Sequence, residues 1–88
     1  MVRMATLEHA QAEIRRVLRD HGRLGTDPET LATDADLYKA GMTSHASVNV
    51  MLALESEFEV EFPDHMLKGN VFRSIGSIER ALRELIAA

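Results

Sequence analysis

The chain has 88 residues, which is enough for one small domain with a single hydrophobic core. We therefore expect residues 1–88 to form a single domain. Hydrophobic residues make up 45% of the chain and charged residues 27%, a composition that excludes a disordered segment. The absence of cysteine excludes disulfides and thiolate metal sites, and it favours a reducing compartment.

No stretch approaches the roughly 18 consecutive apolar residues that a membrane span needs. Residues 1–8 also lack the apolar run of a secretory signal. We therefore expect a cytoplasmic protein that does not contact a membrane.

The formal net charge of −4 hides a segregation of charge along the chain. Residues 1–25 contain five Arg and three acids, residues 26–66 contain nine acids and one Lys, and residues 67–88 contain four basic residues and two acids. A nucleic-acid-binding protein would concentrate Lys and Arg on one face, so we expect no nucleic-acid partner. The acidic middle segment is suited to docking on basic patches of partner proteins, or it is simply a solvated surface.

The first predicted element is an amphipathic helix over residues 6–21. Thr6 is suited to be its N-cap, and apolar residues follow at spacings of three and four, at Leu7, Ala10, Ile14, Val17 and Leu18. Gly22 and Gly25 end this helix. From there to Thr43 the sequence has no sustained period, which predicts a long loop. Such a loop is unusual in a compact domain and indicates a function. We expect Leu31, Leu37 and Tyr38 to hold it to the core.

A second helix is predicted to begin at Thr43 or Ser44, either of which can cap it, and to end near Phe58. At about 100° per residue, its core face comprises Ser47, Val50, Met51, Leu54 and Phe58. The flank beside that face comprises Ser44, Val48, Leu52 and Glu55. Val48 and Leu52 are thus candidates for contact with a partner; the alternative is that they pack under the long loop.

The remaining segments predict an extended connection, a short helix and a last helix. Residues 59–62 read as the connection, with Phe62 pointing inward, and Pro63 and Asp64 open a helical turn through Met66 and Leu67 that closes near Gly69 and Asn70. Ser74 caps a helix whose apolar stripe comprises Ile75, Ile78, Leu82, Leu85 and Ile86. The sequence therefore predicts an all-α fold with three main helices and one short helix.

The corner at Ser44 carries the strongest functional signal. Gly41 permits a tight turn shortly before a serine that opens a helix, which leaves the serine hydroxyl exposed to another enzyme. A phosphate ester on this hydroxyl would lie against the unpaired N–H groups and the positive dipole end of the helix. Ser44 is therefore suited to carry a phosphodiester; the alternative is that it only caps the helix.

Three motifs occur in register around this corner: Leu-Tyr-Lys-Ala-Gly-Met-Thr-Ser at residues 37–44, Leu-Glu-Ser-Glu-Phe at residues 54–58 and Glu-Phe-Pro-Asp at residues 61–64. Together they resemble the signature of the acyl carrier protein family, and a looser likeness extends over nearly the whole chain. The resemblance implies a right-handed four-helix bundle with a long loop between the first two main helices.

The resemblance also implies a prosthetic group. Ser44 would receive 4′-phosphopantetheine from coenzyme A through a separate phosphopantetheinyl transferase that uses magnesium, with Gly41 and Thr43 shaping the corner. The terminal thiol of this group would carry an acyl or aminoacyl group as a thioester. The second helix is the usual docking surface in the family, and here it presents His45, Val48, Asn49, Leu52 and Glu55.

The residues around Ser44 narrow the resemblance. Fatty-acid carriers usually have Asp before the serine, Leu after it and acids on the first turns of the helix, whereas this chain has Thr43, His45, Ala46 and Asn49. The usual Gly-Gly-x-Ser corner of peptide-synthetase carriers is also absent. A closer likeness is to small free-standing carriers that receive amino acids from amino acid:carrier protein ligases, which are truncated homologues of class II aminoacyl-tRNA synthetases.

This likeness implies a monomeric aminoacyl carrier that presents its cargo to a downstream acceptor enzyme. Two alternatives stay open: a fatty-acid or polyketide type of acyl carrier protein served by another acyl-loading enzyme, and a helical interaction domain with no prosthetic group. A long acyl chain would need a cavity among the helices, near Met51, Leu54, Phe62 and Ile78, whereas an amino acid would not.

The sequence does not indicate an enzyme. Ser44 and His45 are neighbours, but adjacent helix positions diverge by about 100° and do not face each other, so they form no nucleophile and base pair. The four histidines lack the i, i+4 spacing of a helical metal pair, and we expect no metal site.

Overall fold

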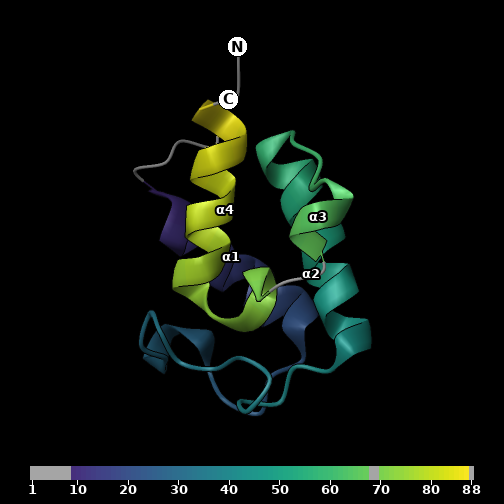
Figure 1. Ribbon diagram of the computed structural model, residues 1–88. Helices are drawn as coiled ribbons and strands as arrows, with labels where there is room; N and C mark the ends of the chain where they lie inside the picture. Colours follow the sequence, from purple (N-terminus) through teal and green to yellow (C-terminus); the bar gives the residue numbers. More distant parts are fainter. Residues whose placement is uncertain (1–8, 68–69, 88) are drawn as a thin grey trace.

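The computed structural model describes residues 9–67 and 70–87, and these residues form four α-helices and no strand (Figure 1). The helices are α1 (Ala10–Val17), α2 (Ser44–Phe58), α3 (Asp64–Leu67) and α4 (Ile75–Ala87). The predicted all-α, four-helix fold is therefore confirmed. The expected N-cap at Thr6 and the expected closing residue Gly69 lie outside the described residues. None of the described helices is both long enough and apolar enough to cross a membrane.

Helix α1 continues into a π-helical turn, η2 (Leu18–Gly22), and the helical path ends at Arg23 in the left-handed conformation, with φ of 55°. The predicted end of this helix near Gly22 is thus confirmed. Its buried face comprises Ala10, Ile14, Val17 and Leu18. The π-helical turn packs mainly against α2, so the first and second main helices contact each other along the wider turn.

The long loop after η2 is held by specific contacts at several points. It contains a 3₁₀-helical turn, η3 (Pro28–Thr30), which Asp27 caps by accepting the N–H of Glu29 at 2.9 Å. The guanidinium of Arg15 on α1 donates to the carbonyl oxygens of Pro28, at 2.6 Å, and Leu31, at 2.8 Å. Because Arg15 satisfies these two carbonyl groups, this part of the loop can lie close to α1 without leaving them unpaired.

Two of the three residues predicted to hold this loop pack as expected. Leu37 is fully buried, and Leu31 packs against the core. The prediction for Tyr38 is wrong, because this residue is 43% exposed. The two side chains are adjacent in one tight turn, and with Leu37 directed into the core, Tyr38 is left at the surface.

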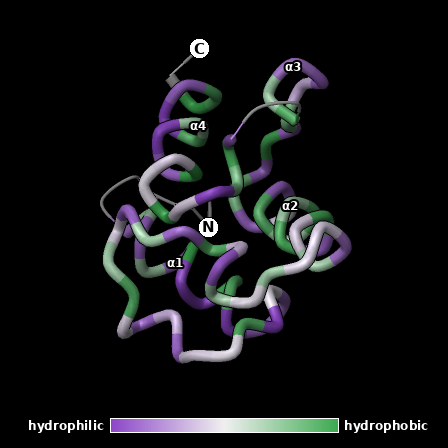
Figure 2. The backbone as a smooth tube through the Cα atoms, turned by 60° about the horizontal axis from the view of Figure 1, so that its bottom comes forward, coloured by the Kyte–Doolittle hydropathy of each residue, from purple (hydrophilic) through white to green (hydrophobic). Residues whose placement is uncertain are grey.

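Helix α2 begins and ends where the sequence predicts. Its buried residues are Ala46, Val50, Leu54 and Phe58, with Met51 partly buried beside them. The predicted core face is therefore correct for Val50, Met51, Leu54 and Phe58, but it omitted Ala46, and its fifth member Ser47 is only half-buried. In Figure 2 much of α2 is green and white, whereas the turns of α4 alternate between purple and green, so α2 carries apolar residues on more than its core face.

The C-terminal half closes the core over α2. Phe62, in the extended connection, is 4% exposed and packs edge-to-face on Phe72 with ring centroids 5.3 Å apart. Phe72 belongs to a second 3₁₀-helical turn, η4 (Val71–Arg73). Ser74 then caps α4 through the N–H of Ser77 at 3.0 Å, as predicted. The α4 stripe is buried at Ile75, Ile78, Ala81 and Leu82, but Ile86 in the last turn is 39% exposed and lies outside the core, which corrects the prediction for that residue.

Candidate functional site

Ser44 is the first residue of α2 and is exposed. Its neighbour Thr43 is the N-cap, because the Thr43 hydroxyl accepts the N–H of Ala46 at 3.0 Å. Ser47, one turn later, donates its hydroxyl to the carbonyl of Ser44 at 2.6 Å. Among residues 9–67 and 70–87, nothing bonds to the hydroxyl of Ser44 itself. Capping by Thr43 thus leaves this oxygen available for chemistry.

The start of α2 also offers unpaired donors. The Thr43 side chain satisfies the N–H of Ala46, and the Thr43 carbonyl accepts the N–H of Ser47 at 2.9 Å. The N–H groups of Ser44 and His45 have no acceptor within the described part of the chain, as expected for the first positions of a helix. These donors and the positive dipole end of the 15-residue helix favour an anion attached at Ser44.

The turn that leads to this corner requires glycine at position 41. Gly41 has φ of 119°, a conformation that L residues with a side chain rarely adopt. A Cβ atom there would also lie 3.0 Å from the backbone nitrogen of Gly25, which donates to the carbonyl of Ala40 at 3.0 Å. Met42 follows and is buried. Gly41 therefore lets two segments of the loop approach closely, while Met42 anchors the corner to the core.

Asp36 organises the same turn and was not among the site residues predicted from the sequence. One carboxylate oxygen, Oδ1, accepts the N–H groups of Tyr38, at 2.9 Å, and Lys39, at 3.3 Å. The other, Oδ2, lies 3.2 Å from Nε of Arg73. Desolvation acts to raise the pKa of Asp36, but the two N–H donors and the positive charge of Arg73 outweigh it and hold the pKa below its usual value. An Asp whose side chain accepts the N–H of the residue two positions later forms an Asx-turn, and an Asp at the start of a turn is the sequence signal for it.

The flank of α2 beyond Ser44 is exposed. Val48 is 49% exposed and Leu52 is 53% exposed, so the alternative that they pack under the loop is wrong. His45 is exposed and Asn49 is half-buried. Glu55 is half-buried and accepts the N–H of Phe62 at 2.9 Å, which gives this carboxylate a role in the fold.

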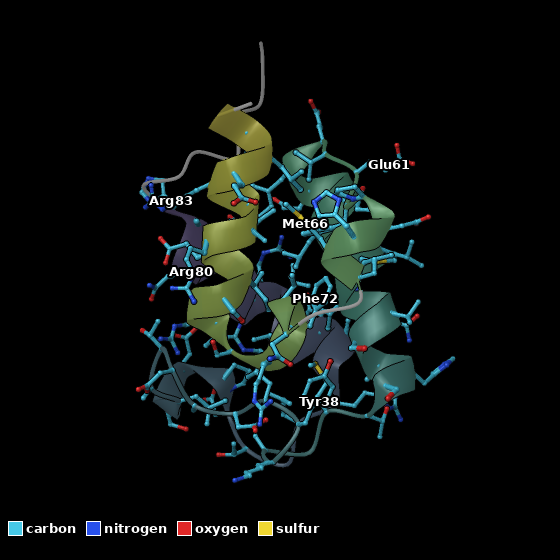
Figure 3. The ribbon with its side chains drawn as sticks, viewed as in Figure 1. Tyr38, Glu61, Met66, Phe72, Arg80 and Arg83 are labelled. Carbon is cyan, nitrogen blue, oxygen red and sulfur yellow. The ribbon has the colours of Figure 1, made fainter. Side chains whose placement is uncertain are left out.

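Hollows lie on both sides of this flank. Toward η4, a cavity of about 160 Å³ is lined by Tyr38, Ser47, Val48, Met51, Leu67 and Phe72. Figure 3 shows Tyr38 on the loop below Phe72 on η4, two of the residues that line this cavity. Toward α1, a more open groove of about 420 Å³ includes Asn49 and Leu52 in its lining. The exposed apolar side chains of α2 thus stand between two hollows.

A long acyl chain would need a cavity near four residues, Met51, Leu54, Phe62 and Ile78. Three of the four belong to the packed core. Leu54 and Ile78 are fully buried in one cluster, and Phe62 is nearly so. Met51 instead lines the cavity toward η4. That cavity has about the volume of a site that takes a single benzene molecule.

The acids of the middle segment are largely used within the chain. Glu57 pairs with Arg16 at 2.7 Å, and Glu29 pairs with Arg19 at 2.8 Å. With the contacts of Asp27, Asp36 and Glu55 described above, at least five acids in residues 26–66 have an intramolecular partner. Within the part of the chain that the structure describes, no three His, Asp or Glu side chains gather as a set of metal ligands.

Comparison with known proteins identifies the family. A family model described as the phosphopantetheine attachment site matches residues 13–82, which include Ser44 and most of the fold. The chain belongs to this family. An aminoacyl carrier protein of Agrobacterium fabrum (strain C58) is 44% identical over 75 residues, which cover 85% of this chain and 90% of that protein.

Solved structures agree with this membership. Two complexes of an engineered Bradyrhizobium japonicum glycine:[carrier protein] ligase with a carrier protein from Agrobacterium tumefaciens contain a chain similar to this one. In the complex with AMP the identity is 45%, the TM-score is 0.80 and the match covers 83% of this chain and 97% of that chain. In the complex with ATP the corresponding values are 44%, 0.84, 88% and 100%. A solution structure of an Agrobacterium tumefaciens protein is 43% identical with a TM-score of 0.72, over 88% of this chain and 93% of that chain.

These similarities confirm two predictions from the sequence. The chain has the predicted carrier fold. It also resembles an aminoacyl carrier protein and carrier chains that are seen in complex with a glycine:[carrier protein] ligase.

Proposed function

We propose that this protein is an aminoacyl carrier that bears 4′-phosphopantetheine on Ser44. One observation carries the proposal: the Ser44 hydroxyl is exposed and unengaged at the first position of α2, in a chain whose family is defined by phosphopantetheine attachment. Thr43 supports this role by capping the helix, and Gly41 supports it by bending the chain into the corner. The exposed hydroxyl and the unpaired N–H groups beside it fit a phosphodiester.

The proposed attachment reaction transfers the phosphopantetheinyl group from coenzyme A to Ser44. The Ser44 Oγ attacks the phosphorus that joins pantetheine to the rest of coenzyme A, and a new P–O bond forms. The P–O bond to 3′,5′-adenosine diphosphate breaks, and that nucleotide leaves. The hydroxyl proton passes to a base of the transferase or to water. The attached group would supply a terminal thiol, which a chain without cysteine otherwise lacks, and this thiol would hold the cargo.

The similarity to aminoacyl carriers favours an amino acid as the cargo. The relative from Agrobacterium fabrum is named an aminoacyl carrier protein, and the similar carrier chains occur in complexes with a glycine:[carrier protein] ligase. The cavity of about 160 Å³ beside Val48 is also too small for a long acyl chain, whereas an aminoacyl group needs no cavity. A ligase of this kind is therefore the proposed loading partner.

The carrier would catalyse nothing itself. A phosphopantetheinyl transferase, the ligase and a downstream acceptor enzyme would each dock beside Ser44, on the flank that presents His45, Val48, Asn49, Leu52 and Glu55. Tethering raises the effective concentration of the cargo at each active site, which is the contribution of the carrier to the reaction. We propose that residues 1–88 do this as one monomeric domain in the cytoplasm.

Intact mass spectrometry tests the attachment. The chain is incubated with coenzyme A, magnesium and a broad-specificity phosphopantetheinyl transferase. We expect a gain of one phosphopantetheine in the unsubstituted chain and in Ser47→Ala, the matched control on the same helix, and no gain in Ser44→Ala. A gain in Ser44→Ala, or no gain in the unsubstituted chain with any transferase, would contradict the proposal.

A loading assay tests the cargo. The modified carrier is incubated with ATP and an amino acid:carrier protein ligase, and in parallel with a fatty-acid-loading enzyme and a range of fatty acids. We expect an aminoacyl mass gain that hydroxylamine removes, as it does for thioesters. Loading by fatty acids alone would favour the fatty-acid type of carrier and overturn the aminoacyl assignment. Stable modification with no loading at all would leave a carrier of another cargo class.

A further inference from the structure

The loop before Ser44 contacts the C-terminal half of the molecule at two places. The carbonyl oxygen of Thr33 accepts the N–H of Gly76 at 2.9 Å, and, nearer to Ser44, residues 36–37 contact residue 73. Nε of Arg73 lies 3.2 Å from Oδ2 of Asp36, and the carbonyl oxygen of Arg73 accepts the N–H of Leu37 at 2.7 Å. We call these two contacts the loop latch. They connect residues 36 to 37 positions apart in the sequence, so they form only when the loop is seated on η4.

The latch stands at the start of the turn that ends at the reactive corner. Asp36 Oδ1 holds the N–H groups of Tyr38 and Lys39, and Met42 closes the turn by donating its N–H to the Leu37 carbonyl at 3.0 Å. Thr43 and Ser44 follow at once. The two oxygens of one carboxylate therefore have separate roles: Oδ1 shapes the turn, and Oδ2 ties it to Arg73.

The latch also joins two walls of the cavity beside α2. Phe72 precedes Arg73 and lines the cavity from η4, while Tyr38 follows Leu37 and lines it from the loop. Ser74, the next residue after Arg73, caps α4. The latch thus helps to fix the position of the Ser44 corner relative to the start of α4.

We propose that Asp36 is a positioning residue for phosphopantetheine transfer, because through Arg73 it holds the turn that presents Ser44. This inference rests on the proposed function. A transferase must bring coenzyme A to the Ser44 hydroxyl itself, so it binds the carrier in the state in which the corner is ordered. If the latch opens, only a fraction of molecules has that state, and the apparent affinity falls by that fraction.

The Arg73 side chain is 55% exposed, so solvent screens its interaction with Asp36, whose own side chain is 19% exposed. An ion pair that solvent screens contributes little to global stability, and its loss should leave the bundle folded. The effect of opening the latch therefore belongs to KM for the carrier. Once the carrier is bound and the corner ordered, the chemical step is unchanged, so kcat should stay near that of the unsubstituted chain.

Steady-state kinetics with the unmodified carrier as the varied substrate test this. Asp36→Asn keeps an oxygen for the N–H groups of Tyr38 and Lys39 but removes the charge that pairs with Arg73. We expect KM to rise about fivefold, with kcat changed by less than about twofold. Arg73→Ala should give the same rise, and the double variant Asp36→Asn/Arg73→Ala should add little to either, because the two side chains act through one contact.

Glu29→Gln is the matched control. Glu29 lies in the same loop and pairs with Arg19 on η2, so this substitution breaks an ion pair of the loop without changing the turn before Ser44. Its KM should equal that of the unsubstituted chain. Amide hydrogen exchange gives a second readout: the Leu37 and Met42 amides should exchange faster in Asp36→Asn, and the Val50 amide inside α2 should not. Circular dichroism confirms that each variant is helical at the assay temperature.

Unchanged KM in both single variants, or an additive double variant, would overturn the role of the latch. So would an equal rise in KM for Glu29→Gln. These outcomes are separate from failure of the proposed function, which would show as no modification of the unsubstituted chain or as modification of Ser44→Ala.

Discussion

Two adjacent residues at the start of α2, Thr43 and Ser44, have separate roles at the corner. Thr43 uses its hydroxyl to satisfy the Ala46 N–H, and Ser44, one position further, has an exposed hydroxyl. Reversed roles would direct the serine oxygen at the backbone and withdraw it from solvent. The cap residue therefore belongs to the proposed attachment site, although it would not contact a reacting atom.

The backbone conformation of Gly41 leads to a prediction about the stability of the fold. Gly41→Ala should destabilise the protein by about 1–3 kcal/mol, because alanine must adopt φ of 119° and its Cβ meets the Gly25 nitrogen at 3.0 Å. Chemical denaturation measures this. Gly25→Ala is the control, since its Cβ would meet only the Ala40 carbonyl, at 3.7 Å, and should cost clearly less. Equal losses for the two variants would show that the turn does not depend on glycine at position 41.

At the scale of elements, α2 serves the core and a surface at once. Its buried residues recur every four positions from Ala46 to Phe58, while Val48 and Leu52, also four apart, stay about half exposed. Residues 44–54 contain no Asp, Glu, Lys or Arg, so the part of α2 nearest Ser44 offers apolar contact without formal charge. Glu61, by contrast, lies at the end of the molecule away from the loop (Figure 3).

Val48→Asp tests whether partners dock on this flank. A carboxylate buried against an apolar partner surface loses hydration without compensation, so kcat/KM for aminoacylation by the ligase should fall at least about tenfold. Ile86→Asp is the matched control, because Ile86 is a similarly exposed apolar residue on α4. The thermal midpoint should change little in either variant, because both sites are exposed. Equal activity of the two variants would exclude Val48 from the interface.

The whole molecule is held together by contacts between helices that are distant in sequence. Gln11 on α1 donates its side-chain N–H to Glu79 on α4 at 2.8 Å, and Arg16 on α1 pairs with Glu57 on α2 at 2.7 Å. In Figure 1 α1 passes behind α4, with which it is in contact. These polar contacts border the hydrophobic core, which supplies most of the stability.

Glu79 makes part of this stability depend on pH. The hydrogen bond from Gln11 lowers the pKa of Glu79, burial opposes this, and Arg83 lowers it further. A folded-state pKa below the unfolded value means that the contribution is present above the unfolded pKa and is lost as the pH falls through the folded pKa. Glu79→Gln should therefore lower the free energy of unfolding by on the order of 1 kcal/mol at neutral pH.

The difference between Glu79→Gln and the unsubstituted chain should shrink as the pH falls below about 4, the region of the unfolded glutamate pKa. Urea unfolding at several pH values measures it. Glu84→Gln, an exposed position on α4, is the control and should change the free energy little. A difference that is independent of pH would show that the charge of Glu79 does not contribute to stability.

Periodicity and capping chemistry in the sequence were enough to predict the helices, most of their core faces and the corner at Ser44. They report which side chains share a face and where a helix begins, and both are local properties. The motifs at residues 37–44, 54–58 and 61–64 were enough for the family. Ser44 as the attachment point stays a prediction that the mass experiment tests.

Only the tertiary structure decided how the long loop is seated. The contacts of Arg15 with the loop carbonyls and of Asp36 with Arg73 join residues far apart in the chain, and no local pattern specifies such pairs. The same packing turns Tyr38 outward and leaves Ile86 beyond the core, although each has an apolar neighbour that is buried or half-buried. Local chemistry determines the elements, whereas the burial of one side chain over its neighbour depends on what the rest of the fold places against it.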